Sequence, residues 1–188
     1  RGSTGAARGQ HTPNTQQGKS RSVLHDRSTS RAVSSEKSKQ VGDTIKSGVV
    51  DAYRATHDGF STDYLIADPE MNIRFVEKCA RLSVPGDPVV WNQTLLRLRK
   101  QGRLPKLAKS GVRKTYQDMD QYSFASEVAL HYLSVSFDMT LDALLCDPDI
   151  AAKFDQVADE FAPGHRPFEY RWAALSLRKR AKQAKRMA

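Results

Sequence analysis

The chain repeats itself when it is shifted by 79 residues. Residues 45–100 align with residues 124–179 without a gap, and 13 of these 56 positions are identical. Unrelated sequences match at roughly one position in fifteen to twenty, so this similarity indicates an internal duplication. Both copies end in the pattern Leu-x-Leu-Arg-Lys. The identical pairs are Ser47/Ser126, Val49/Val128, Tyr53/Tyr132, Asp63/Asp142, Leu65/Leu144, Asp68/Asp147, Pro69/Pro148, Phe75/Phe154, Pro88/Pro167, Leu96/Leu175, Leu98/Leu177, Arg99/Arg178 and Lys100/Lys179.

Apolar residues three or four positions apart predict helices in both copies. In the first copy they predict a helix from Val41 to a stop at Gly59, a short helix at 62–67, and helices that begin at Asp68-Pro69 and Asp87-Pro88. An aspartate followed by proline suits the first turn of a helix, because the carboxylate caps it and proline lacks an N–H. The second copy repeats this order, with Phe124, Val128 and Tyr132 in its first helix and Phe161 on the inner face of its third.

No sustained two-residue alternation is present, so we expect an all-α fold, with residues 103–112 as the one candidate extended segment. Residues 1–40 hold few large apolar side chains and are expected to be a disordered basic tail. The first helical repeat with its basic connector then covers residues 41–115. The second repeat, with a basic C-terminal helix, covers residues 116–188.

The two cysteines, Cys79 and Cys146, fall within apolar helical patterns and are expected to be buried free thiols in a reducing compartment. No apolar run is long enough to predict a membrane span. We therefore expect a cytoplasmic or nucleoid-associated protein. The chain begins with Arg1, as expected of a fragment or a processed form, and its basic first residues fit an organellar transit peptide less well than a tail.

The net charge of +9, from 30 lysines and arginines against 21 acids, favours an anionic partner. Residues 97–114 carry eight basic side chains and residues 171–188 carry seven, and neither segment contains an acid. Between them, residues 116–169 have a net charge of −9. Complementing a helix dipole accounts for two or three cations at a helix end, which is fewer than either segment holds. The positive charge at the end of each repeat is therefore predicted to contact nucleic acid.

The helix, Pro-Gly corner and helix at 62–102 and 141–180 resemble the layout of a helix-turn-helix DNA-binding unit. The resemblance is architectural and implies no particular family. It predicts that the fourth helix of each copy meets DNA, with base contacts from Asn92, Gln93 and Arg171. The predicted phosphate contacts are Arg97, Arg99, Lys100, Arg103, Lys106, Arg178, Lys179, Arg180 and Lys182.

Signatures of catalysis are missing from the sequence. No lysine follows an acid by two residues as in one class of nuclease, the five histidines lack partners at zinc spacing, and no Walker-type glycine loop occurs. Asp147, Asp149 and Asp155 are better explained as a helix cap and as charges near a helix N-terminus than as metal ligands. Trp91 and Tyr170 are expected to pack in the core. We therefore expect no enzyme, no metal and no cofactor.

The sequence thus predicts a non-catalytic protein that binds double-stranded DNA through two tandem helix-turn-helix-like units, as a regulator or an accessory factor. One alternative is a protein-interaction module that docks a partner on the acidic surface of the second copy. A second alternative is an RNA-binding component of a ribonucleoprotein particle, for which a long basic tail is typical.

Overall fold

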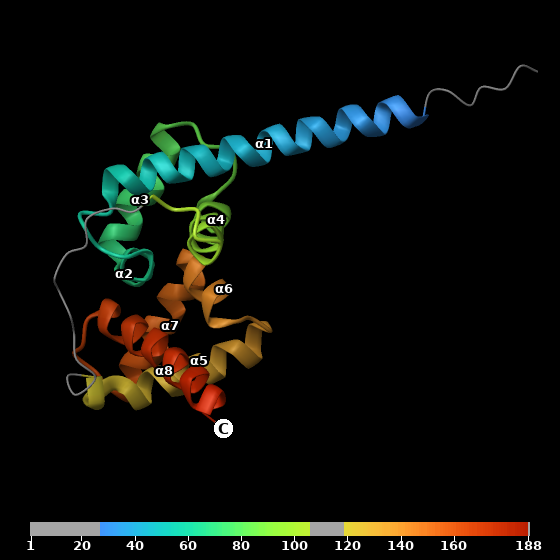
Figure 1. The fold of residues 1–188 in the computed structure, drawn as a ribbon. Helices are drawn as coiled ribbons and strands as arrows, with labels where there is room; N and C mark the ends of the chain where they lie inside the picture. Colours follow the sequence, from blue (N-terminus) through green and yellow to red (C-terminus); the bar gives the residue numbers. More distant parts are fainter. Residues whose placement is uncertain (1–26, 106–118, 188) are drawn as a thin grey trace, which may run out of the picture. The chain divides into compact units, whose positions relative to one another are not determined.

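The computed structural model describes residues 27–105 and 119–187, with side chains for residues 36–105 and 119–180. The described residues form eight α-helices and contain no strand, as the all-α prediction requires (Figure 1). Contacts divide the chain into residues 1–36 and residues 37–188. All of the buried core lies in the second of these units.

Helix α1 (Arg27–Thr56) begins well before the predicted start at Val41. The described helix thus takes in residues 27–40 of the expected tail, and residues 1–26 lie outside the described part. The polar sequence there gave no apolar periodicity, which is why the helix start was missed. The last turns of α1 do enter the core, where Val49 and Tyr53 are buried.

Three predicted helices of the first half are confirmed almost to the residue: α2 (Thr62–Ala67), α3 (Pro69–Arg81) and α4 (Pro88–Lys100). Asp68 caps α3, because its Oδ1 accepts hydrogen bonds from the backbone N–H groups of Glu70 and Met71. Asp87 caps α4 in the same way by accepting from the N–H of Val90. Each cap is followed by the predicted proline in the first turn.

The second half contains α5 (Asp120–Phe137), α6 (Leu141–Cys146), α7 (Pro148–Phe161) and α8 (Pro167–Met187). Helices α6, α7 and α8 begin 79 positions after α2, α3 and α4. The caps correspond too, with Ser61 and Thr140 before the short helices and Asp68 and Asp147 before the next. The starts of α2, α3 and α4 and those of α6, α7 and α8 are therefore separated by the same 79 residues as the matching sequences.

The first helix of each half departs from that shift. The connection to the next helix has five residues in the first half, 57–61, and three in the second, 138–140. A difference of two residues turns an α-helix by roughly 200°, so another face meets the core. Tyr53 is 6% exposed, but its aligned residue Tyr132 is 58% exposed.

The expected inner position of Phe161 is wrong, since this residue is more than half exposed, and Phe124 is more than half exposed too. For Phe124 the cause is the same rotation, which places Ala125, Ala129 and Leu133 against the core instead. Phe161 is the last residue of α7, where the helix ends.

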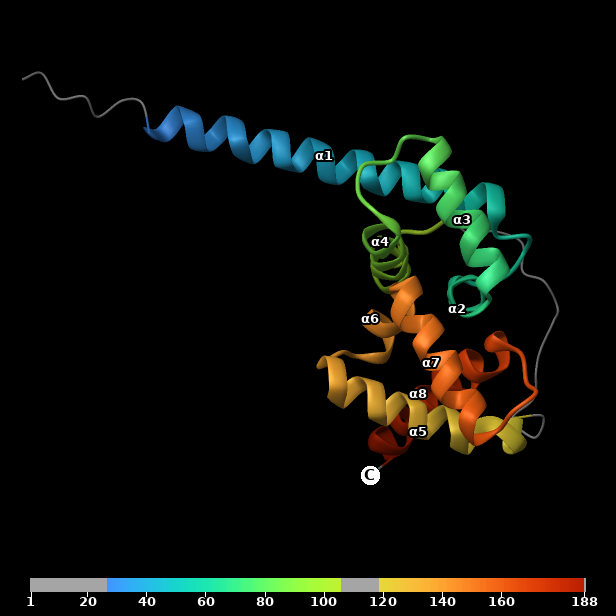
Figure 2. The ribbon, with the colours of Figure 1, turned by 180° about the vertical axis from the view of Figure 1, so that it is seen from behind.

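The two halves share one hydrophobic core and pack against each other through their short and last helices. Helix α4 packs on α6 of the other half, and α8 packs on α2 in return (Figure 2). Leu95, Leu96 and Leu98 are all buried, so α4 is held on more than one side. No helix in the described part of the chain is long and apolar enough to cross a membrane.

Candidate functional site

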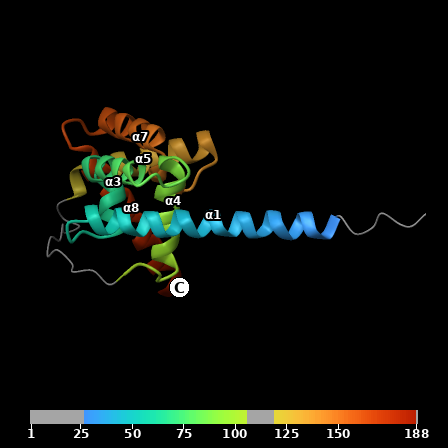
Figure 3. The same cartoon turned by 90° about the horizontal axis from the view of Figure 1, so that it is seen from above.

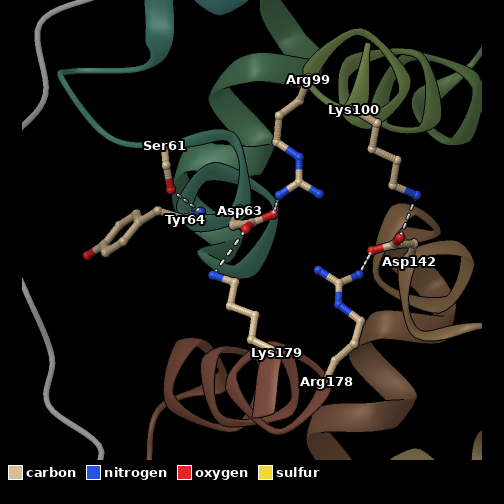
Figure 4. A network of polar contacts seen from close by, with 8 residues as sticks. All are labelled: Ser61, Asp63, Tyr64, Arg99, Lys100, Asp142, Arg178 and Lys179. Atoms are coloured by element: carbon tan, nitrogen blue, oxygen red, sulfur yellow. Dashed lines mark hydrogen bonds and ion pairs between the residues drawn. The ribbon is translucent and has the colours of Figure 1, made fainter. Parts of the chain in front are cut away.

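Asp63 of α2 binds one cation from each half of the protein. Arg99 Nη1 from the end of α4 donates to its Oδ1, and Lys179 Nζ from α8 lies 3.3 Å from its Oδ2 (Figure 4). The side chain of Asp63 is only 10% exposed. A carboxylate this buried needs compensating charge, which the two cations supply.

Asp142 of α6 occupies the matching place in the second half. Arg178 Nη1 from α8 donates to its Oδ1, and Lys100 Nζ from α4 lies 2.7 Å from its Oδ2. Burial acts to raise the pKa of this carboxyl, but the hydrogen bonds and charges of Lys100 and Arg178 outweigh burial and lower the pKa below its ordinary value. Asp142 is therefore ionised at neutral pH.

The two sets of ion pairs are reciprocal. Each arginine binds the aspartate of its own half, and each lysine binds the aspartate of the other half. All six residues belong to the identical pairs of the repeat. We call Asp63, Arg99, Lys100, Asp142, Arg178 and Lys179 the reciprocal network.

Positive charge exceeds negative charge in this region. The reciprocal network contains four cations and two carboxylates, and exposed Arg97 lies beside it, lining a recess of about 220 Å³ with Lys100 and Asp142. These residues sum to a net charge of +3. The ends of α4 and α8 point toward the same side of the unit (Figure 3). The sequence of residues 181–187 adds three more cations and no acid to α8.

Two of the three predicted base contacts are buried. Asn92 is 0% exposed; its Nδ2 donates to the carbonyl of Cys146 at 3.0 Å, and its Oδ1 accepts from Asn72 Nδ2 at 2.9 Å. Its role is to join α4 to α3 and α6. Because the amide is inside the core and paired, it has no access to a base edge, which corrects the prediction. Gln93, the next residue, is exposed.

Arg171, the other buried candidate, is 6% exposed and makes a two-pronged ion pair with Asp155 of α7. Burial raises the pKa of Asp155, although the hydrogen bond and charge of Arg171 oppose that rise. The pair ties α7 to α8. This guanidinium is occupied inside the protein and is not presented to DNA, so its predicted base contact is also corrected.

The predicted phosphate contacts fall into three groups. Arg97, Arg103 and Arg180 have exposed side chains, as phosphate binding requires. Arg99, Lys100, Arg178 and Lys179 belong to the reciprocal network, where both lysines remain more than half exposed. Lys106 lies outside the described residues, and Lys182 is on α8 with its side chain outside them.

The core positions predicted for Trp91 and Tyr170 are confirmed. Trp91 is 6% exposed and donates from Nε1 to the carbonyl of Pro85, and Tyr170 is 1% exposed. Trp172 is half-buried and stacks on Phe168, while Lys179 Nζ lies 5.4 Å from the centre of the Trp172 ring. Trp91 and Tyr170 are therefore not presented for base stacking.

Sequence reasoning missed Asp63 and Asp142 as site residues. The signal was present, because these acids and the Arg-Lys pairs at 99–100 and 178–179 are all identical between the two copies. Their pairing was not predictable from one sequence, since it depends on how the halves pack.

The described residues contain no group of three or more histidine, cysteine or acidic side chains that could hold a metal ion. Asp147 acts as the predicted helix cap, accepting from the N–H groups of Asp149 and Ile150. Burial raises the pKa of the Cys79 and Cys146 thiols to about 12, so neither is a ready nucleophile.

Comparison with protein-family models, curated proteins and solved structures gave no match.

Proposed function

We propose that the protein binds double-stranded DNA without catalysis, and that it does so chiefly through phosphate contacts. The binding surface consists of the exposed cations at the ends of α4 and α8. The observation that supports this proposal is the cation excess of the reciprocal network and Arg97, where the described residues place five cations with two carboxylates. Phosphates are the anions that such clustered lysines and arginines bind most often.

The mode of binding differs from insertion of a recognition helix into the major groove. Helix α4 is packed against α6, and α8 against α2, so neither offers a whole face to a groove. With Asn92 and Arg171 buried, Gln93 is the exposed residue left for a base contact. We therefore expect binding with little sequence preference.

We also infer that the two halves descend from one duplicated helical unit. Helix starts 79 residues apart, equivalent aspartate caps, equivalent arginine ion pairs and exchanged lysine ion pairs support this inference. The two halves would then fold and act together, because each half supplies a lysine to the aspartate of the other. A duplicated unit would also place two similar cationic helix ends on one side, which suits a repeating polyanion.

The test is a salt titration of the full chain with duplex DNA, single-stranded RNA and heparin. Duplex preference with affinity that falls steeply as salt rises is the expected result. Preference for the RNA would favour the RNA-binding alternative. Absence of binding at low salt would overturn the proposal and favour a protein partner.

A further inference from the structure

Helix α5 carries an apolar stripe on its outer face. Phe124, Tyr132 and Val135 are 68%, 58% and 71% exposed, and Val128 between them is half-buried. Their spacings of four, four and three residues place them on one side of the helix. We call these four residues the α5 stripe. Adjacent exposed apolar side chains of this size mark an interaction surface more often than isolated ones do.

The stripe borders a wide groove. Phe124 belongs to both, and Leu130, Leu141 and Leu177 continue the apolar lining of the groove, which has a volume of about 1000 Å³. The core-facing side of α5 is already occupied, because Ala125, Ala129 and Leu133 are buried there. The stripe is therefore additional apolar surface that does not contribute to the core.

The charge on this surface does not suit nucleic acid. Between residues 121 and 137, α5 contains one acid, Glu127, one histidine, His131, and no lysine or arginine. The stripe itself offers a polyanion no cation, and the cations that line the neighbouring groove, Arg178 and Arg180, come from α8. An apolar partner surface with little like charge fits instead.

The stripe is complementary to itself when two copies run antiparallel. A twofold axis between residues 129 and 130 places Phe124 opposite the partner's Val135 and Val128 opposite the partner's His131. The acid Glu127 then lies within one residue's rise, about 1.5 Å along the axis, of the partner's His131. Phe124 and His131 thus face the smaller valines, Tyr132 faces the partner's Glu127, and that acid lies beside the histidine.

We propose that two copies of this chain associate through their α5 stripes in an antiparallel, twofold arrangement. Twofold pairing buries the same patch on both subunits and closes after two copies, so no exposed stripe remains. The dimer also carries two cationic surfaces of the kind formed by α4 and α8.

Sedimentation equilibrium of the full chain at increasing concentration tests the proposal. Wild type should dimerise, and Tyr132→Glu or Val135→Glu should weaken the dimer at least tenfold, because each places a carboxylate in the stripe. Ile73→Glu is the matched control, since Ile73 is 57% exposed on α3, and it should dimerise as wild type does. A monomer at every concentration overturns the proposal, as does a dimer that neither stripe variant weakens.

Cysteine cross-linking distinguishes the antiparallel arrangement from others. Chains with Phe124→Cys mixed with chains with Val135→Cys should form a mixed disulfide. Val135→Cys alone should not, because the two positions would lie about 16 Å apart along the axis, too far for a disulfide. Cross-linking of Val135→Cys alone would overturn the antiparallel arrangement. The native thiols are buried and do not interfere.

Discussion

Lys100 Nζ lies 2.7 Å from Asp142 Oδ2, and this ion pair joins the last helix of one half to the short helix of the other. Its counterpart, Lys179 with Asp63, joins the halves in the opposite direction. The cations proposed to meet DNA phosphates therefore also hold the two halves together. Stability and binding have to be measured separately in any variant of these residues.

Asp142→Asn should lower the free energy of unfolding by about 1–3 kcal/mol, because it leaves Lys100 and Arg178 without their carboxylate. Urea unfolding at pH 7 measures the decrease. Asp149→Asn, at an exposed position of α7, is the control and should change stability little. An unchanged urea midpoint for Asp142→Asn would show that the ion pairs of Asp142 do not contribute to the free energy of unfolding.

The same variant has a defined pH dependence. Since the pKa of Asp142 is lowered in the folded protein, its contribution is present above the unfolded pKa, roughly 3.9, and is lost as pH falls through the folded value. The stability difference between wild type and Asp142→Asn should therefore be constant from pH 7 to about 5 and shrink below pH 4. A difference that grows on acidification would contradict this account.

Asn92→Ala should destabilise the protein by roughly 2–3 kcal/mol, because Asn72 and the Cys146 carbonyl lose a buried partner. Gln93→Ala, one residue away and exposed, should change stability by less than about 0.5 kcal/mol. Urea unfolding measures both. A change of DNA sequence preference in folded Asn92→Ala would contradict its assignment as a structural residue.

Arg97→Gln combined with Arg103→Gln should weaken DNA binding for all sequences and reduce the salt slope by about 0.9 for each phosphate that the variant no longer neutralises. Neither side chain is in the reciprocal network, so the fold should be unaffected. Arg74→Gln with Arg81→Gln removes the same charge from exposed positions on α3 and is the matched control. Equal effects of the two double variants would indicate a general charge effect rather than a defined surface.

Gly48→Ala should destabilise the fold although alanine favours helix, because the added Cβ would lie 2.5 Å from Val84 Cγ2. The expected decrease in the free energy of unfolding is about 1–3 kcal/mol. Combining it with Val84→Ala should recover part of this decrease, since the space opened at residue 84 accepts the new methyl group. A double-mutant cycle by urea unfolding measures the coupling, and strictly additive effects would exclude the close approach.

Cys79 and Cys146 should resist alkylation by iodoacetamide at pH 8 in the native protein and react when unfolded in urea. Both thiols are buried and have pKa values of about 12, so little thiolate is present at that pH. Mass spectrometry counts the modified residues. Rapid modification of Cys146 in the native state would show that the recess beside it opens.

The helices from α2 to α4 and from α6 to α8 were predictable because their starts are encoded locally. Asp68-Pro69, Asp87-Pro88 and Asp147-Pro148 fix the first turns by backbone chemistry that needs no tertiary context. The start of α1 was not, since its first residues form a polar helix without an apolar stripe.

Tertiary packing decided what the sequence left open. The identity of Tyr53 and Tyr132 suggested equivalent positions, but the shorter connection before α6 rotates α5 and exposes Tyr132. Asn92 looked like a polar residue available to DNA, and its partners lie 20 and 54 residues away in the chain. Hydrogen bonds of that range carry no local signature.

The exchanged lysines make each half depend on a residue of the other. Removal of the acid at Asp142 leaves Lys100, 42 residues earlier in the chain, without its partner, and a change at Lys179 affects Asp63 likewise. Substitutions at these positions should therefore covary between the copies in related sequences. Neither half could then lose its aspartate or its lysine without leaving a charge of the other half unpaired.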